Sequence, residues 1–130
     1  MKDESLMPPD NRTSLVQAPI NTMLELQDQL SRFLGVYNLE EEEQYRSTLA
    51  QLAVESSEAL APFLNLTKPW KTTSVNYEEV DEEIIDVLHY VLTYFNLRQL
   101  KEHDILALYI MKNSRNFSRV QEKMKRLKEN

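Results

Sequence analysis

The scarcity of chain breakers constrains this sequence most, because its 130 residues contain a single glycine, Gly35. Of the five prolines, three lie within the first 19 residues. Folds rich in β-structure need frequent turns built on Gly and Pro, so the rest of the chain favours long helices. We therefore predict an irregular N-terminal arm over residues 1–19 and a single all-α domain over residues 20–130.

Apolar residues recur at helical spacing in four stretches. The first helix is expected to begin at Asn21 or Thr22, either of which can cap it, and to end at Gly35. The other helices are expected at about Glu41–Phe63, Tyr77–Leu100 and from His103 or Asp104 to Leu127, with a loop over residues 64–76. Their inward stripes are expected to be Met23, Leu26, Leu30 and Leu34; Leu49, Leu52, Ala53, Ser56, Leu60 and Phe63; and Val80, Ile84, Val87, Leu88, Val91 and Phe95. Four helices with short connections predict a four-helix core bundle.

Charge and composition exclude several classes of protein. The formal net charge of −6 argues against a nucleic-acid-binding surface over the whole protein, which would be basic. No apolar run approaches the ~20 residues that span a membrane, and the polar N-terminus does not resemble a signal peptide. The absence of cysteine excludes disulfides and thiolate metal sites, and it is compatible with the cytoplasm.

Two pairs of acidic residues stand in sequence contexts that lack compensating charge. Glu55 and Glu58 are the only charged residues between positions 47 and 67, and on a helix their side chains project from neighbouring turns. Two like charges this close are unfavourable, and a divalent cation would offset the cost. For a single pair, a solvated helix face is the commoner explanation.

The second pair is Glu83 and Asp86, again three residues apart, followed by eleven residues without a formal charge if His89 is neutral. Glu79 and Glu82 could equally serve beside Asp86. If the two helices pack side by side, four carboxylates converge, and such hard oxygen ligands suit Mg²⁺ or Mn²⁺. His89 lies one turn after Asp86 and could line the same cavity, although a core role is commoner for such a histidine.

A basic stripe occupies the last predicted helix. Lys112, Asn116 and Arg119 follow i, i+4, i+7 spacing, with Tyr109 and Asn113 on or beside that face. Two cations and an amide pointing one way are suited to phosphate oxygens. Alone, the stripe would be read as the polar face of an amphipathic helix. Combined with four carboxylates, it favours a triphosphate bridged by metal ions.

The spacing Glu55-x-x-Glu58, 24 residues, Glu83-x-x-Asp86 resembles the ExxE…ExxD signature of the all-α nucleotide pyrophosphohydrolases. This superfamily comprises the dimeric dUTPases, the dCTP pyrophosphatases and the MazG-like enzymes. Three further segments, which are residues 23–27, 68–71 and 109–119, resemble the opening helix, the Trp-Lys segment and the phosphate-binding helix of the dimeric dUTPases. The resemblance is greatest to the bacteriophage dCTPase–dUTPase branch and covers about residues 20–122.

The resemblance implies Mg²⁺-dependent hydrolysis of dUTP or dCTP to the monophosphate and pyrophosphate, with Mn²⁺ as a substitute metal. Glu55, Glu58, Glu83 and Asp86 would hold the metal, and Glu55 or Glu58 would act as the general base. Lys112, Asn113, Asn116, Arg119 and Tyr109 would bind phosphate. Gln27, Trp70, Lys71 and His89 would contact the base or nucleoside. The resemblance further implies a homodimer or larger homo-oligomer in the cytoplasm of a bacterial or phage-infected cell.

Two other interpretations are compatible with these residues. One is a broad MazG-like nucleoside triphosphate pyrophosphatase. The other is a helical interaction module without catalytic activity, for which metal ions would not stabilise the fold and loss of Glu58 would cost little.

Overall fold

The computed structural model describes residues 18–64 and 74–129, and this part of the chain is helical with no strand. In chain order its elements are α2 (Pro19–Leu34), the 3₁₀ turn η1 (Val36–Asn38), α3 (Glu41–Leu64), α4 (Tyr77–Leu97) and α5 (Glu102–Glu129). The predicted all-α class with four helices is thus confirmed. None of the described helices is both long and apolar enough to cross a membrane. The expected arm lies almost entirely outside the described residues.

The first helix, α2, begins earlier than predicted. It starts at Pro19, whose fixed φ suits the first helical position, and Ala18 takes the N-cap place without a side-chain bond. Neither of the two expected residues caps the helix. The Thr22 hydroxyl donates to the Ala18 carbonyl at 3.1 Å, and Asn21 accepts from the Glu102 amide at the start of α5. The predicted stop at Gly35 is confirmed, with φ at +80°, a conformation that favours glycine.

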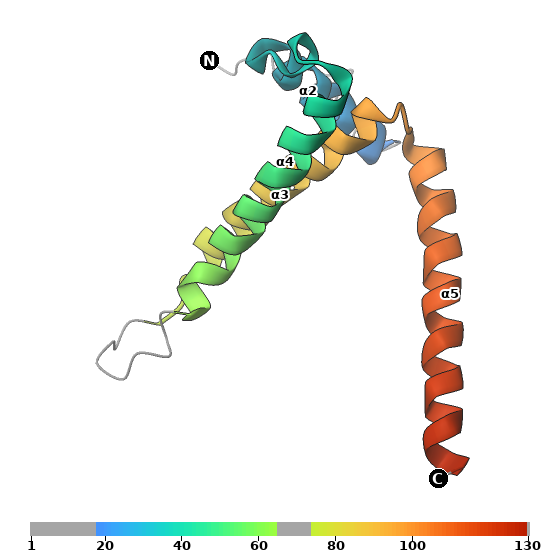
Figure 1. Ribbon diagram of the computed structural model, residues 1–130. Helices are drawn as coiled ribbons and strands as arrows, with labels where there is room; N and C mark the ends of the chain where they lie inside the picture. Colours follow the sequence, from blue (N-terminus) through green and yellow to red (C-terminus); the bar gives the residue numbers. More distant parts are fainter. Residues whose placement is uncertain (1–17, 65–73, 130) are drawn as a thin grey trace.

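Helices α3 and α4 lie side by side and antiparallel (Figure 1). At one end the Tyr45 hydroxyl donates to the Leu97 carbonyl at 3.2 Å, and the Tyr45 and Tyr94 rings meet edge to face. At the other end, Phe63 packs on Tyr77 in the same manner. Aromatic contacts at both ends therefore fix how far α3 is displaced along α4.

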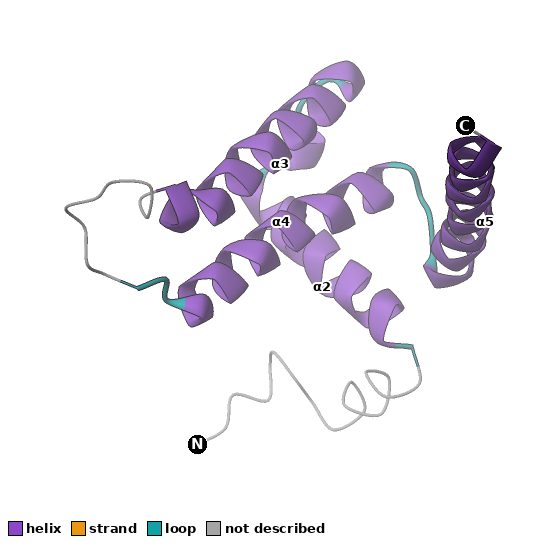
Figure 2. Cartoon of the chain, turned by 90° about the horizontal axis from the view of Figure 1, so that it is seen from below, coloured by secondary structure: helices purple, strands orange, loops and turns teal. Residues whose placement is uncertain are grey.

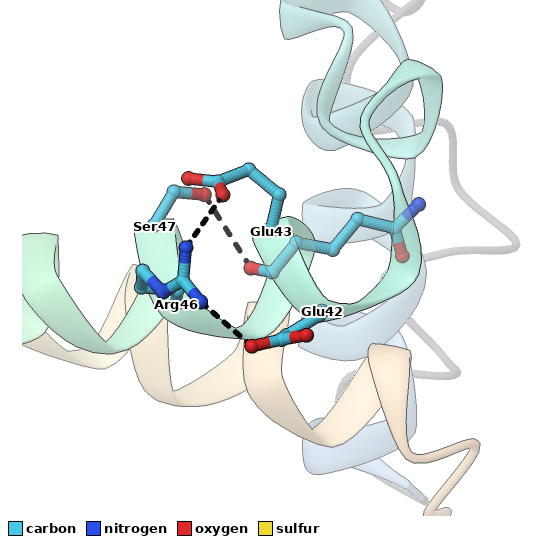
Figure 3. A network of polar contacts seen from close by, with 5 residues as sticks. Glu42, Glu43, Arg46 and Ser47 are labelled. Carbon is cyan, nitrogen blue, oxygen red and sulfur yellow. Dashed lines mark hydrogen bonds and ion pairs between the residues drawn. The ribbon is translucent and has the colours of Figure 1, made fainter.

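The first turn of α3 carries three glutamates, which suit the positive end of the helix dipole. Arg46 bridges two of them, with 2.6 Å to Glu42 and 3.0 Å to Glu43 (Figure 3). Beside it, the Ser47 hydroxyl donates to the Gln44 carbonyl at 3.4 Å. These ion pairs are exposed and contribute only tenths of a kcal/mol, so they support the start of the helix and do not build the core.

Helix α4 is central, because both α2 and α3 pack against it. The buried apolar core is small and comprises Leu24, Ala59 and Leu92. It is joined by buried polar residues from the same three helices, which are Thr22, Gln27, Ser31, Thr48 and Thr93. Polar side chains thus make up much of the interior, and the three threonines among them each donate to a backbone carbonyl four residues earlier.

The predicted inward stripes are partly wrong. On α2, Leu30 and Leu34 are exposed. On α3, Leu52 alone of the predicted stripe is not exposed, whereas Thr48 and Ala59, which neighbour Leu49 and Leu60, are buried. Ile84 on α4 is also half exposed, although the rest of its predicted stripe is at least partly covered. Helical spacing identified residues that share a face, but the faces turned toward α4 are the more polar ones.

Helix α5 runs away from the other three helices (Figures 1 and 2). The helix before it ends at Leu97, three residues before the predicted end, and Gln99 then adopts a positive φ of 58°. Every described residue of α5 from position 106 onward is exposed. The bundle formed within one chain therefore consists of α2, α3 and α4.

Candidate functional site

Three of the four predicted carboxylates come together where α3 packs against α4. Glu55 and Glu58 from α3 and Glu83 from α4 each offer an oxygen, and these three oxygens lie within 4.8 Å of one another. Their i, i+3 spacing on α3 and the antiparallel packing of α4 produce this meeting. Among the candidates beside Asp86, Glu83 joins the cluster, whereas Glu79 and Glu82 do not.

The cluster is electrostatically unfavourable as it stands. One carboxylate oxygen of Glu55 and one of Glu83 are buried without a hydrogen-bond partner. Desolvation, a hydrogen bond with Glu58 and the nearby negative charges raise the pKa of Glu55 above its ordinary value. Desolvation and the charges of Glu58 and Asp86 likewise raise the pKa of Glu83. The arrangement therefore concentrates negative charge at one place between α3 and α4.

Asp86 lies at the side of the three-carboxylate cluster and does not join it. Its charge nevertheless contributes to the raised pKa values of Glu55 and Glu83, so it is electrostatically part of the site. Its Oδ1 atom is 3.8 Å from His89 Nδ1, and both side chains are nearly half exposed. Tyr90 faces the same acids: desolvation, followed by the charge of Glu55, raises the pKa of its hydroxyl.

A cavity of about 420 Å³ opens beside these carboxylates. It is bounded by α2, η1, α3 and α4, and Glu55 and Asp86 lie in its wall. The rest of its lining combines polar and apolar side chains, which are Gln27, Leu30, Ser31, Leu34, Val36, Ser47, Thr48, Gln51, His89, Tyr90 and Thr93. A cavity of this size and mixed lining is typical of small-molecule sites.

Gln27 is held in the cavity wall by two successive hydrogen bonds. Its Nε2 atom donates to the Thr93 hydroxyl at 3.0 Å, and that hydroxyl donates its only proton to the His89 carbonyl at 2.8 Å. Because the hydroxyl can then only accept from Gln27, the amide is fixed with its nitrogen toward Thr93. Gln27 is therefore a buried residue with an oriented amide.

Several cavity residues were missed in the sequence. The Ser31 hydroxyl is buried and has no hydrogen-bond partner, and it follows Gln27 by one helical turn. Thr48 and Thr93 are also buried in the wall. The available signal was the polar pair Gln27 and Ser31 at i, i+4, because on a helix they share a face with each other and with Leu24.

Other predicted residues lie elsewhere. Trp70 and Lys71 lie outside the described residues. The proposed phosphate-binding residues are all exposed on α5, and these are Tyr109, Lys112, Asn113, Asn116 and Arg119. Because α5 packs along none of the other described helices, a single chain does not bring this stripe to the carboxylates.

The carboxylate cluster fits a hard divalent cation. Its donors are carboxylate oxygens, which Mg²⁺ and Mn²⁺ prefer, and two of them are buried without a partner. A cation would supply the charge that desolvation and mutual repulsion leave unbalanced.

Comparison with known proteins gives one finding. A family described as dUTPase matches residues 19–101, which cover α2, η1, α3 and α4 and stop just before α5. No curated protein and no solved structure matches the chain.

Proposed function

The chain belongs to the dUTPase family, since the match spans more than half of its length, and we propose that it hydrolyses dUTP or dCTP with Mg²⁺ as cofactor. Membership of this family supports a general activity, which is hydrolysis of a nucleoside triphosphate to the monophosphate and pyrophosphate. The observation that supports the finer proposal most is the meeting of Glu55, Glu58 and Glu83 beside a cavity that contains an oriented amide.

In the proposed reaction, a water oxygen attacks the α-phosphorus and the bond from that phosphorus to the bridging oxygen of pyrophosphate breaks. Glu55 or Glu58 orients the water and takes up its proton as general base. Mg²⁺, held by Glu55, Glu58, Glu83 and Asp86, would neutralise phosphate charge and acidify water when bound. Mn²⁺ has the same preference for oxygen ligands and should substitute for it.

Gln27 would contact the pyrimidine edge. Because Thr93 holds its nitrogen, its Oε1 atom is the part of the amide left to accept a hydrogen from a ligand. The N3–H of uracil and the exocyclic amine of cytosine can each donate to such an atom. The buried Ser31 hydroxyl, one turn away and without a partner, offers a donor for the same edge.

The other parts of the proposed site follow from the resemblance. His89, Trp70 and Lys71 would contact the nucleoside. The five polar residues of α5 from Tyr109 to Arg119 would bind the phosphates. A homo-oligomer and a cytoplasmic location in a bacterial or phage-infected cell also stay predictions.

A substrate panel tests the proposal. The purified protein is incubated with Mg²⁺ and each of dUTP, dCTP, dTTP, dATP and dGTP, and pyrophosphate and monophosphate are measured. We expect release from dUTP or dCTP, abolished by Glu58→Gln and unaffected by Glu78→Gln, which removes an exposed charge elsewhere. Equal turnover of all five would favour a broad MazG-like enzyme. No release with Mg²⁺ or Mn²⁺ would contradict the proposal and favour a non-catalytic interaction module.

A further inference from the structure

A second cavity opens on a different face of α2 from the cavity beside the carboxylates. It has a volume of about 730 Å³, and the two cavities share no lining residue. Its walls come from α2, η1, the last turn of α4 and the connection over residues 98–101 that leads to α5. Leu24 is the only aliphatic residue in this described lining, so the second cavity offers a ligand hydrogen bonds and charges rather than an apolar surface.

One cation of the second cavity, Arg32, is held in place by its neighbours. Asp28 Oδ2 accepts from Arg32 Nε at 2.9 Å, and Asp28 Oδ1 accepts from the Tyr37 hydroxyl at 2.5 Å. The guanidinium carbon of Arg32 lies 5.0 Å from the centre of the Tyr37 ring. The hydrogen bond from Tyr37 lowers the pKa of Asp28, so this carboxylate stays ionised beside Arg32. Because these bonds use Nε alone, both Nη groups of Arg32 can donate to a ligand.

A second cation, Lys101, comes from the connection and lies near the same acid. Its charge contributes to the lowered pKa of Asp28, yet its ammonium group forms no ion pair with any described residue. The Glu102 amide donates to Asn21 Oδ1 at 2.9 Å, which fixes the connection against the start of α2. Two cations from separate segments thus lie near one carboxylate whose oxygens are already bonded. A guanidinium and an ammonium placed in this way suit the oxygens of a phosphate group.

The rest of the lining is suited to hydroxyl groups. Asn96 Nδ2 donates to a main-chain carbonyl of α2 at 2.9 Å, and Asn21 uses its Oδ1 atom as an acceptor, so each amide has its other atom left for a ligand. The side-chain amide of Gln99 and the carboxylate of Glu25 have no hydrogen-bond partner in the part of the chain that the structure describes. A hydroxyl both donates and accepts, so it can bind to each of these groups.

The lining also favours a sugar over a nucleobase. Tyr37 is the only aromatic residue of the described lining, and Arg32 covers one face of its ring. Leu24 is 1% exposed, so it adds no apolar surface on which a base could lie. We propose that the second cavity binds a small sugar phosphate, with its phosphate between Arg32 and Lys101 and its hydroxyls on the amides and Glu25. Such a site needs neither the carboxylate cluster nor a metal ion, so it is independent of the proposed hydrolysis.

Calorimetric titration of the full-length chain tests the site without turnover. EDTA is present, so that no metal carries phosphate to the carboxylate cluster, and the probes are ribose 5-phosphate, inorganic phosphate, ribose and dUMP. We expect ribose 5-phosphate to bind more tightly than inorganic phosphate, and ribose alone not to bind. Binding of dUMP should be no tighter than that of ribose 5-phosphate, because the lining offers a base no free surface. Tighter binding of dUMP would overturn the choice of a sugar phosphate in favour of a nucleotide.

Variants of the two cations test their role. Lys101→Gln should raise the dissociation constant of ribose 5-phosphate roughly tenfold or more, because it removes a charge-assisted hydrogen bond. The Lys101 side chain has no partner among the described residues, so the variant should fold, which circular dichroism checks. Arg32→Lys keeps a charge beside Asp28 but loses the paired Nη groups, so it should also weaken binding. Lys125→Gln, which removes an exposed cation of α5, should leave binding unchanged.

Main-chain amide shifts in ¹H–¹⁵N spectra locate the ligand. With ribose 5-phosphate they should change at Arg32, Gln99 and Lys101 and not at Thr48 or Gln51, which line the cavity beside the carboxylates. Absence of saturable binding, a dissociation constant unchanged by Lys101→Gln, or shifts confined to Thr48 and Gln51 would each overturn the inference. The expected binding without hydrolysis of any nucleotide would instead count against the proposed function alone.

Discussion

Replacing Thr93 by valine should remove the hydrogen bond that holds the Gln27 amide, with little change in side-chain shape. Gln27 and Thr93 are 7% and 3% exposed, so the bond between them is buried. Valine leaves the Gln27 Nε2 donor buried without its partner 3.0 Å away and removes the bond to His89. A stranded buried donor costs about 1–2 kcal/mol. For a domain of this size, that corresponds to a fall in Tm of roughly 4–9 °C.

A double-mutant cycle isolates this effect from general damage to the core. Urea unfolding is measured for the wild type, Thr93→Val, Gln27→Met and the double variant. Gln27→Met removes the amide that Thr93→Val would strand, so Thr93→Val should cost about 1 kcal/mol less in that background. If the enzyme acts as proposed, the freed amide in Thr93→Val should also bring the dUTP to dCTP ratio of kcat/KM closer to one. If Thr93→Val lowered the free energy of unfolding equally in both backgrounds, the proposed hydrogen bond between Gln27 and Thr93 would be refuted.

Further predictions concern the carboxylate cluster and the core. In a thermal-shift assay with EDTA, Glu83→Gln should raise Tm, because it relieves repulsion at a buried oxygen. With Mg²⁺ present, the same variant should be stabilised less than the wild type. Glu82→Gln, which changes an exposed neighbour, should have neither effect. The raised pKa values of Glu55 and Glu83 mean that the folded apo protein binds protons more tightly than the unfolded chain. Their contribution to stability is therefore fully present below the ordinary value of 4.5 and is lost as pH rises through the raised pKa, and saturating Mg²⁺ should abolish that trend in urea titrations. Leu24→Ala, at a side chain only 1% exposed, should cost about 2–5 kcal/mol in the same titrations, and a cost below 1 kcal/mol would contradict the core described above.

The helices were predictable because their signals are local. Spacing of apolar residues and the single glycine placed Gly35 at the end of α2, and α3 begins at the predicted residue and ends one residue later than expected. Its interior Pro62 does not break it. The start of α2 was missed because a capping side chain was expected, whereas Pro19 begins the helix without one.

The spacing of apolar residues does not show which helix each helical face packs against. Thr48 and Ala59 face inward while Leu49 and Leu60 face outward, and the choice depends on which helices meet. The sequence identified Gln27 but missed Ser31 and Thr93, because serine and threonine are ordinarily surface residues. The two acidic pairs, in contrast, were recognisable because each stands in a stretch without compensating charge, although Asp86 stays outside the cluster of Glu55, Glu58 and Glu83. The location of α5 depends on bonds such as that between Glu102 and Asn21, which are distant in sequence.

Hydrolysis in ¹⁸O-labelled water tests the proposed chemistry most directly. The protein, Mg²⁺ and dUTP or dCTP are incubated in H₂¹⁸O, and the masses of the products are measured by mass spectrometry. Attack of water at the α-phosphorus predicts one ¹⁸O atom in the nucleoside monophosphate, none in pyrophosphate, and no products above background with Glu58→Gln. Label in pyrophosphate, release of orthophosphate in place of pyrophosphate, or unchanged turnover by Glu58→Gln would contradict the account.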